Sequence, residues 1–316
     1  MTDENRDYPP TADQATIAAV IVTWNKRVEV LRCIESVLAS THPIQAIIVV
    51  DNASNDGTVE AIKREFGDTV HLIVNTSNKG GSGGFYDGIS AALCYQTDYL
   101  WLLDNDVILS PQTLSQLLLV AQTQPHVGIV GSKVYFAQAP QIIWSMGARV
   151  NSWLAQISVI GDKVRDEGQY NQLVEVDYVP MCSMLLATRV VEKIGSIDPD
   201  YFVYGDDADF CTRARRAGFR VLSAPASIAW HDVTLSSQRM SPLAMYYYTR
   251  NCIHYFFKFA PAWYKPVTAV LSLLFLSRRL LATIKYWPGL AMFVWVGQAA
   301  LIGFFDAWRG KRGKVY

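Results

Sequence analysis

The sequence predicts an α/β fold built on a parallel sheet whose two faces are covered by helices. Short apolar runs rich in β-branched residues alternate with segments whose apolar residues recur at the helical period. A strand that is apolar throughout has no solvent-facing side, which is typical of parallel sheets packed between two layers of helices. The chain of 316 residues is long enough for one large domain with an appendage.

The first part of the chain repeats this alternation. We expect strands at residues 17–22, 46–50, 71–75 and 99–103, with helices near residues 28–40, 58–66, 85–96 and 111–122. A glycine-rich loop precedes the third of these helices. Ligands bind beyond the carboxyl ends of the strands in such sheets, so the residues directly after each strand are the first candidates for a site.

Beyond residue 125 the pattern is mixed. Strand-like runs occur at residues 127–130, 144–145 and 174–179, and a helix is expected near residues 189–194. A carboxylate-rich segment then opens a helix that runs to about residue 217, and strands near residues 220–222 and 227–230 end at His231. We find no internal repeat and no long linker between residues 15 and 235, which favours a single unit.

The composition argues against a disordered chain and against a basic protein that coats nucleic acid. The 28 Lys and Arg balance 28 Asp and Glu, and 51% of the residues are hydrophobic. The charges are divided unequally, however: residues 251–316 carry nine basic residues and one acid, Asp306, a net charge of +8, which leaves −8 on residues 1–250. An anionic membrane surface is the simplest partner for such a tail, and nucleic acid is less favoured because long apolar runs separate the charges.

The cysteines and the N-terminus indicate a reducing compartment. The five cysteines are odd in number and form no Cys-x-x-Cys pair, which favours buried thiols over disulfides or a zinc site. The first 14 residues are polar and acidic, where a signal peptide would need basic residues followed by an apolar core. We therefore expect the body of the protein to stay in the cytosol.

Two carboxylates, Asp104 and Asp106, follow the predicted strand at residues 99–103. Hard oxygen ligands suit Mg²⁺ or Mn²⁺, which in turn suit a diphosphate. A solvated turn or a helix cap is the alternative. Their place after a buried strand favours the metal, and His231, at the end of another apolar run, is a candidate third ligand.

The ends of two other strands carry candidates for nucleotide binding. Asp51 ends the run IIVV and can accept a hydrogen bond from a nucleobase N–H. The segment NKGGSGGF carries Asn78, Gly80, Gly81, Gly83 and Gly84, whose backbone would let an anionic ligand approach closely. A flexible hinge is the alternative, and the segment is not a phosphate-binding loop of the usual kind, because no lysine follows its last glycines.

A third acidic cluster, Asp206, Asp207 and Asp209, falls in the first turn of a predicted helix. The positive end of a helix favours ionised carboxylates there. Asp209 and Arg213 are four residues apart and can form a salt bridge within the helix. Asp206 or Asp207 then remains free to act as a general base.

The order of these segments closely resembles the inverting, metal-dependent glycosyltransferases of family two, which have the GT-A fold. The resemblance rests on VIVTWNK, VVDNASNDGT, NKGGSGGFYDG, LLDNDV, YGDDADFCTRARRAGFR and WHD, and it covers about residues 16–255. The run YYYTRN at residues 246–251 is similar to the rhamnosyl- and galactofuranosyltransferase branches. The resemblance implies a GT-A catalytic domain at residues 16–255, after a flexible arm at residues 1–15 and before a C-terminal helical region at residues 256–316.

The resemblance also implies a role for each candidate. Thr23 and Asp51 would contact uracil or thymine, Asp104 the ribose or the metal, and Asp106 and His231 would ligate Mn²⁺ or Mg²⁺. Asp207 would be the catalytic base, with Asp206 at a position where many members carry Glu. The acceptor pocket would lie in the region of Trp144, Trp153, Met181 and Cys182, to which no individual roles are assigned.

The implied function is transfer of a sugar from a UDP- or dTDP-sugar to a hydroxyl of a glycan or polyprenyl-linked glycan, in synthesis of bacterial surface polysaccharide. The glycine segment followed by Phe85 favours galactofuranose, and rhamnose from dTDP-rhamnose is the alternative. A nucleotidyltransferase would use similar carboxylates but needs a basic phosphate-binding segment, for which VTWNKR is weak. A non-catalytic lipid-binding protein would leave the three acidic clusters without a task.

The tail predicts contact with a membrane surface. Residues 286–305 are 20 residues without a charge, the minimum for a membrane span. A span would carry the basic cluster at residues 309–314 across the membrane, against the positive-inside tendency. We therefore expect amphipathic helices on the cytoplasmic face of the membrane, anchored by Trp263, Tyr264, Trp287, Trp295 and Trp308. A helical dimer interface or a subdomain that covers the core is the alternative.

Overall fold

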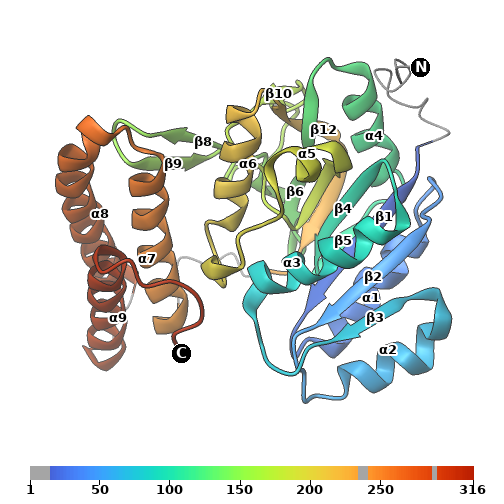
Figure 1. Cartoon of the computed structure of the whole chain (residues 1–316), viewed down its shortest axis with the longest axis horizontal. Coiled ribbons are helices and arrows are strands. Elements are labelled where there is room, and N and C mark those ends of the chain that lie inside the picture. The colour runs from blue at the N-terminus through green and yellow to red at the C-terminus, as the bar shows by residue number, and fades with distance from the viewer. Residues whose placement is uncertain (1–14, 234–240, 287–289) are drawn as a thin grey trace, which may run out of the picture.

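The computed structural model describes residues 15–233, 241–286 and 290–316, which form a mixed sheet between helices and a helical unit at one end (Figure 1). The expected N-terminal arm, except for its last residue, and Trp287 lie outside the described residues. The strands are β1 Ile17–Thr23, β2 Ala46–Asp51, β3 His71–Val74, β4 Tyr99–Asp104, β5 Val107–Leu109, β6 Val127–Phe136, β7 Ala139–Ser145, β8 Ala148–Asn151, β9 Gln156–Val159, β10 Val174–Glu175, β11 Ser183–Ala187 and β12 Arg220–His231. The helices are α1 Arg27–Leu38, α2 Thr58–Phe66, α3 Gly80–Ala92, α4 Thr113–Thr123, α5 Thr188–Ile194, α6 Asp206–Arg216, α7 Pro242–Phe259, α8 Lys265–Tyr286 and α9 Leu290–Trp308.

The main sheet has the strand order β10-β12-β6-β11-β4-β1-β2-β3, with β5 and β7 paired to β12 and β6. Strands β4, β1, β2 and β3 are parallel, as expected, and so are β6 and β12. The expectation of a parallel sheet does not extend to β11, which pairs antiparallel with both β4 and β6. An apolar run shows that a strand is buried on both faces but not which way it runs, and we did not predict β11.

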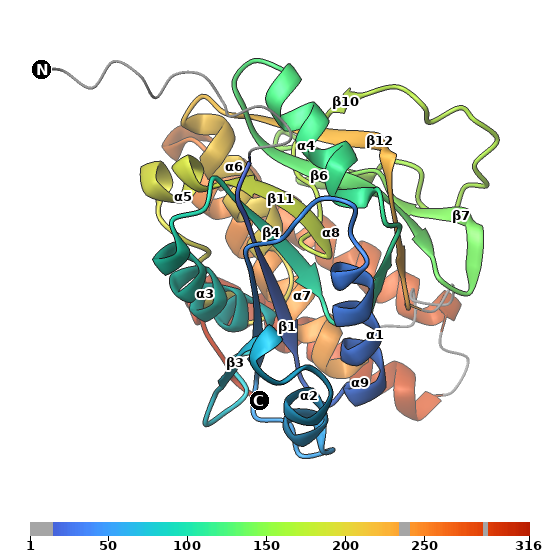
Figure 2. The same ribbon diagram turned by 90° about the vertical axis from the view of Figure 1, so that its right-hand side faces the viewer.

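Helices cover both faces of this sheet. Helices α1 and α4 lie on one face and α3 and α6 on the other (Figure 2). Every residue of β1 and β2 is buried, and the largest fully buried side chain, Trp101, lies in β4. The hydrophobic core therefore surrounds the first strands of the chain on both faces of the sheet and positions their carboxyl ends.

The expected glycine-rich loop at residues 80–84 is wrong, because helix α3 already begins at Gly80. A Cβ atom on Gly84 would lie 2.4 Å from Cγ1 of Val22 in β1, and one on Gly88 would lie 2.4 Å from Cγ1 of Val20. These glycines let the helix lie close against the sheet. Their composition suggested a loop because glycine favours flexible backbone, whereas tertiary packing has the larger effect here.

The C-terminal helices α7, α8 and α9 pack on one another around Met245, Ile253, Leu276, Val296 and Phe304. The hairpin β8–β9 reaches from the body to these helices (Figure 1). Helix α7 is continuous across residue 255, where we expected the catalytic domain to end. The uncharged stretch at residues 286–305 begins at the last residue of α8 and lies mostly in α9; among the described helices, none has the length and apolarity that a membrane span requires.

We expect Gly84→Ala to lower the free energy of unfolding by about 1–3 kcal/mol, because the new methyl group forces α3 away from Val22. Urea denaturation of the full chain measures this change. Gly81→Ala is the matched control, since a Cβ atom there meets no atom within 4 Å. Equal denaturation midpoints for the two variants would show that α3 does not need the close approach.

Candidate active site

Three polar side chains lie together at the carboxyl edge of the parallel strands. Thr23 at the end of β1 pairs in register with Asp51 at the end of β2, and Val22 pairs with Asp104 at the end of β4. Thr23 and Asp51 are both buried. The parallel register thus places side chains that are about 80 residues apart in sequence on one edge, as the sequence suggested.

Asp51 has an unused hydrogen-bond acceptor. Its Oδ1 accepts a hydrogen bond of 2.8 Å from the backbone N–H of Ser54. Its Oδ2 is buried and has no hydrogen-bond partner among the described residues. Buried carboxylate oxygens are normally paired, so this atom is suited to accept an N–H from a ligand. Thr23 is already held in place, because its Oγ1 accepts a hydrogen bond of 2.9 Å from Asn105.

A cavity of about 450 Å³ opens at this edge, and we call it the first cavity. Its walls come from the ends of β1 and β4, from the start of α3 and from the C-terminal part of the chain. Of the residues singled out in the sequence, it is lined by Thr23, Asn78, Gly80, Gly81 and Asp104. Gly83 and Gly84 instead lie buried within α3.

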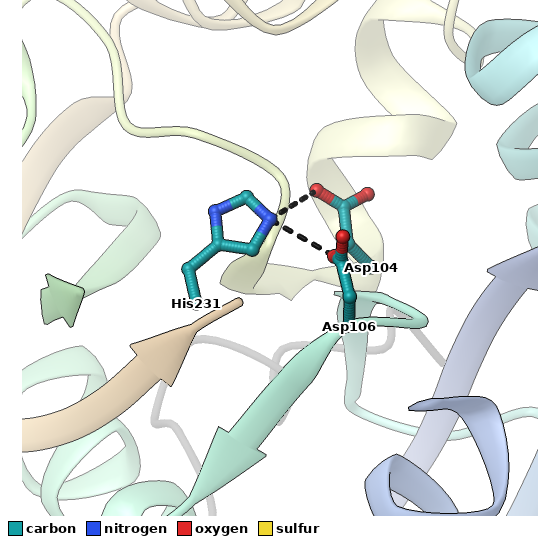
Figure 3. Close-up of side chains that lie close together, drawn as sticks. All are labelled: Asp104, Asp106 and His231. Atoms are coloured by element: carbon teal, nitrogen blue, oxygen red, sulfur yellow. Dashed lines mark hydrogen bonds and ion pairs between the residues drawn. The ribbon is translucent and has the colours of Figure 1, made fainter. Parts of the chain in front are cut away.

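Asp104, Asp106 and His231 form a compact cluster beside this cavity (Figure 3). The Nε2 atom of His231 lies 2.9 Å from Oδ1 of Asp106 and 3.9 Å from Oδ2 of Asp104. Strand β5 pairs with β12 and brings the turn that carries both aspartates against His231. One ligand atom from each residue falls within 4.8 Å of the others, so the three can hold a metal ion together.

The charges in this cluster are strongly coupled. Burial raises the pKa of Asp104 to about 6, although the charge of His231 opposes this shift. Burial also raises the pKa of Asp106, but the hydrogen bond from His231 outweighs it and the pKa lies below its usual value. Burial lowers the pKa of His231, whereas Asp106 and Asp104 raise it above its usual value. The two acids therefore favour a positive charge at Nε2, where a divalent cation would replace a proton.

A second cavity, of about 380 Å³, adjoins the first and shares Gly81, Asp104, Val203 and Tyr204 with it. It is lined by Asp206 and Asp207 in the first turn of α6, and also by His231. Of the residues in the expected acceptor region, Trp144 and Met181 line it. Trp153 instead packs against Trp263 at 5.8 Å between ring centroids.

The three acids of α6 have different environments. Asp209 is fully buried and is bound by Arg213 at 2.7 Å, Tyr201 at 3.0 Å and Lys258 at 2.5 Å, which confirms a structural salt bridge. Burial, together with the neighbouring charge of Asp206, raises the pKa of Asp207 to about 8. In its ionised form, a carboxylate with a raised pKa is a stronger proton acceptor than an ordinary one.

We assigned no role to Arg250 or Asn251 from the sequence. The Nδ2 atom of Asn251 donates to the carbonyl oxygens of Tyr201, Val203 and Tyr204, which precede α6. Buried Arg250 donates to the carbonyl oxygen of Tyr201 at 3.0 Å. These residues position the loop that carries the acids. An Arg-Asn pair within an aromatic helix was the available signal, because such polar groups need buried partners.

The sheet thus carries, at one edge, a cluster that can hold a metal ion and two adjoining cavities. Residues 14–246 match the family described as "Glycosyltransferase like family 2", and the chain belongs to this family. All the candidate site residues lie within this range.

The curated relatives include galactofuranosyltransferases. The chain is 24% identical over 272 residues to galactofuranosyltransferase GlfT2 of Mycolicibacterium smegmatis, a match that covers 77% of this chain and 41% of that protein. It thus spans about two fifths of that relative's length. It is also 24% identical over 201 residues to the low-salt glycan biosynthesis hexosyltransferase Agl10 of Haloferax volcanii, covering 62% of each chain.

Solved structures support the fold. The mannosyltransferase PcManGT from Pyrobaculum calidifontis, in complex with GDP-Man and Mn²⁺, is 18% identical, with a TM-score of 0.59 over 95% of this chain and 90% of that chain. GalNAc-T7 with UDP, GalNAc and Mn²⁺ is 16% identical, with a TM-score of 0.61 over 79% of this chain and 49% of that chain. At these identities the likeness establishes a shared fold.

We expect Mn²⁺ to raise the melting temperature of the wild-type chain by about 5 °C at saturation, because the ion binds only the folded cluster. Asp106→Asn should lose most of this shift, since it removes a charged ligand. Thermal unfolding with and without Mn²⁺ measures it.

Asp232→Asn is the matched control, because Asp232 is an exposed carboxylate beside His231 and outside the cluster. An equal Mn²⁺ shift in wild type and Asp106→Asn would place the metal elsewhere.

Proposed function

We propose that the protein is an inverting, metal-dependent glycosyltransferase that moves a sugar from a UDP- or dTDP-sugar to a hydroxyl of a glycan or polyprenyl-linked glycan. The observation that carries the proposal is the pair of adjoining cavities that share Asp104. A nucleotide in the first cavity and an acceptor in the second would meet beside the cluster of Asp104, Asp106 and His231.

Residues in and beside the first cavity bind and orient the donor. Asp51 accepts the N–H of uracil or thymine through its free Oδ2, and Thr23 lies beside it in register. Asp104, Asp106 and His231 hold Mn²⁺ or Mg²⁺. This ion, when bound, supplies positive charge that stabilises the diphosphate leaving group.

Asp207 acts as the general base in the second cavity. It takes the proton of the acceptor hydroxyl while the oxygen bonds to the anomeric carbon, and the bond from that carbon to the diphosphate breaks. Attack from the face opposite the leaving group inverts the configuration. Burial of Asp207 and the negative charge of Asp206 both help Asp207 to hold the proton, because both raise its pKa.

The names of the relatives support a choice of sugar. GlfT2 and a second relative, GlfT1 of Mycolicibacterium smegmatis, are called galactofuranosyltransferases. Galactofuranose from a UDP donor is therefore the first sugar to test, and rhamnose from a dTDP donor is the second. The sequence similarity to a hexosyltransferase of glycan biosynthesis supports a glycan acceptor.

The C-terminal helices are our proposed contact with the cytoplasmic face of the membrane. Helices α8 and α9 and the turn before them expose large apolar side chains, among them Trp263 at 71%, Leu281 at 65% and Trp295 at 66%. Exposed tryptophans beside basic residues are typical of interfacial helices. Contact with the membrane would bring the protein close to a lipid-linked acceptor.

We expect Asp207→Asn to bind UDP or dTDP in the presence of Mn²⁺ as tightly as wild type does, but to transfer sugar at least about 100-fold more slowly. The amide keeps the shape of the side chain and cannot take the proton. Calorimetric titration measures binding, and product formation from UDP-galactofuranose or dTDP-rhamnose measures transfer.

Asp206→Asn is the matched variant. We expect a smaller loss of transfer, because Asp206 acts only through the effect of its own charge on Asp207. Turnover of Asp207→Asn within about tenfold of wild type would move the base elsewhere. If wild type binds neither nucleotide, the proposed function is wrong.

For the membrane we expect wild type to float with liposomes that contain anionic lipid and the double variant Leu281→Ser, Trp295→Ser to remain largely in solution. The control is Leu119→Ser, an exposed leucine at 49% on α4, which should float like wild type. Unchanged flotation of the double variant would contradict the membrane contact. Sedimentation of the same proteins tests whether this face instead pairs two copies of the chain.

A further inference from the structure

The segment after α9 turns back to the body of the protein (Figure 1). We call residues 309–316 the return segment. The N–H of Gly313 donates to the carbonyl oxygen of Asp200 at 2.6 Å, and its carbonyl oxygen accepts a hydrogen bond of 2.7 Å from Arg250. The N–H of Val315 donates to the hydroxyl of Tyr247 at 3.0 Å. Backbone and side-chain contacts therefore fix the path of the return segment.

The same residue holds the return segment and the loop before α6. Arg250 is buried and donates to Tyr201 in that loop as well as to Gly313. Arg312 of the return segment adds an ion pair with Asp198, which lies just before the loop. The return segment is thus seated on the part of the chain that carries Asp206 and Asp207.

This path brings Lys314 and Tyr316 to the wall of the first cavity, with Thr23, Gly80 and Asp104 on other parts of it. The Nζ atom of Lys314 lies 5.9 Å from the ring centroid of Phe202. The carbonyl oxygen of Phe202 accepts a hydrogen bond of 3.1 Å from Ser82 in the first turn of α3. Lys314 therefore lies near the start of α3, on the side where Gly80 and Gly81 line the cavity.

The first cavity needs positive charge if it holds a diphosphate. Among the described residues, those that line it and carry a charge are Asp104, Lys26 and Lys314. Lys26 is paired with Glu29 at 3.2 Å, whereas none of the ion pairs among the described residues includes Lys314. A diphosphate gains a further negative charge when its bond to the sugar breaks, and a nearby ammonium group stabilises that charge.

We propose that Lys314 binds the diphosphate of the nucleotide donor, so that the return segment forms part of the donor site. This inference rests on the proposed function and extends it to a part of the chain outside residues 14–246, the range of the family match. Tyr316 packs edge-on against Tyr246 of α7 at 5.0 Å between ring centroids and keeps the segment against the cavity.

The test compares Lys314→Met with Lys311→Met in the full chain. Lys311 is the matched control, because it belongs to the same segment but pairs with Asp306 at 3.3 Å. In the presence of Mn²⁺ we expect Lys314→Met to bind UDP or dTDP, whichever wild type prefers, about tenfold more weakly. Binding of the matching nucleoside monophosphate should change much less. Lys311→Met should bind both as wild type does, and Lys314→Arg should recover most of the affinity.

The outcomes separate this inference from the proposed function. If wild type binds neither diphosphate, the proposed function is wrong and the inference with it. If wild type binds and Lys314→Met binds equally well, the inference alone is wrong. An equal loss for mono- and diphosphate, or an equal loss in Lys311→Met, would also overturn it, because neither fits a specific contact with the diphosphate. Thermal unfolding of each variant establishes that it is folded.

Discussion

The hydrogen bonds of the buried guanidinium of Arg250 hold together the parts of the chain that surround the two cavities. A buried charge is tolerated only when its donors are satisfied, and Arg250 satisfies them with Asn251 and with carbonyl oxygens from two distant segments. One segment carries the acids of α6 and the other is the return segment. Loss of this group would remove the donor to Gly313 in the return segment and one of the donors to Tyr201 in the loop, so its effect would reach both cavities.

The loop held by Arg250 and Asn251 is strained. Phe202 and Tyr204 have φ values of 66° and 65°, in the left-handed region that large residues avoid. Such a backbone persists only where many contacts stabilise it. Here Asn251 donates hydrogen bonds to the carbonyl oxygens of three loop residues. The strained loop leads directly into α6, which begins with Asp206 and Asp207 at the second cavity. The strain is therefore part of how the fold positions these two acids.

The sequence predicts those strands that have a clear local apolar pattern, and the candidate residues that directly follow them. The buried runs at β1, β2 and β4 could be identified, and the parallel register then brings Thr23, Asp51 and Asp104 to one edge. The start of α3 could not be predicted from the sequence, because glycine is needed at residue 84 to avoid contact with Val22, which is remote in sequence. Lys314 could not be placed either, since only the fold of α7 and α9 brings it to the first cavity.

The division of charge between the two parts of the chain has an explanation within the molecule. We expected the basic tail to meet an anionic membrane, but two of its cations pair with the acidic body: Lys258 with Asp209, and Arg312 with Asp198. The acids that line the second cavity are close enough to interact, since burial, together with the charges of Asp206 and Asp104, raises the pKa of Asp207. The two tail cations neutralise other acids of the body, Asp209 and Asp198, where the tail docks. The acidic body and the basic tail are therefore complementary, and only the charges that remain exposed on the tail are free to act on a membrane.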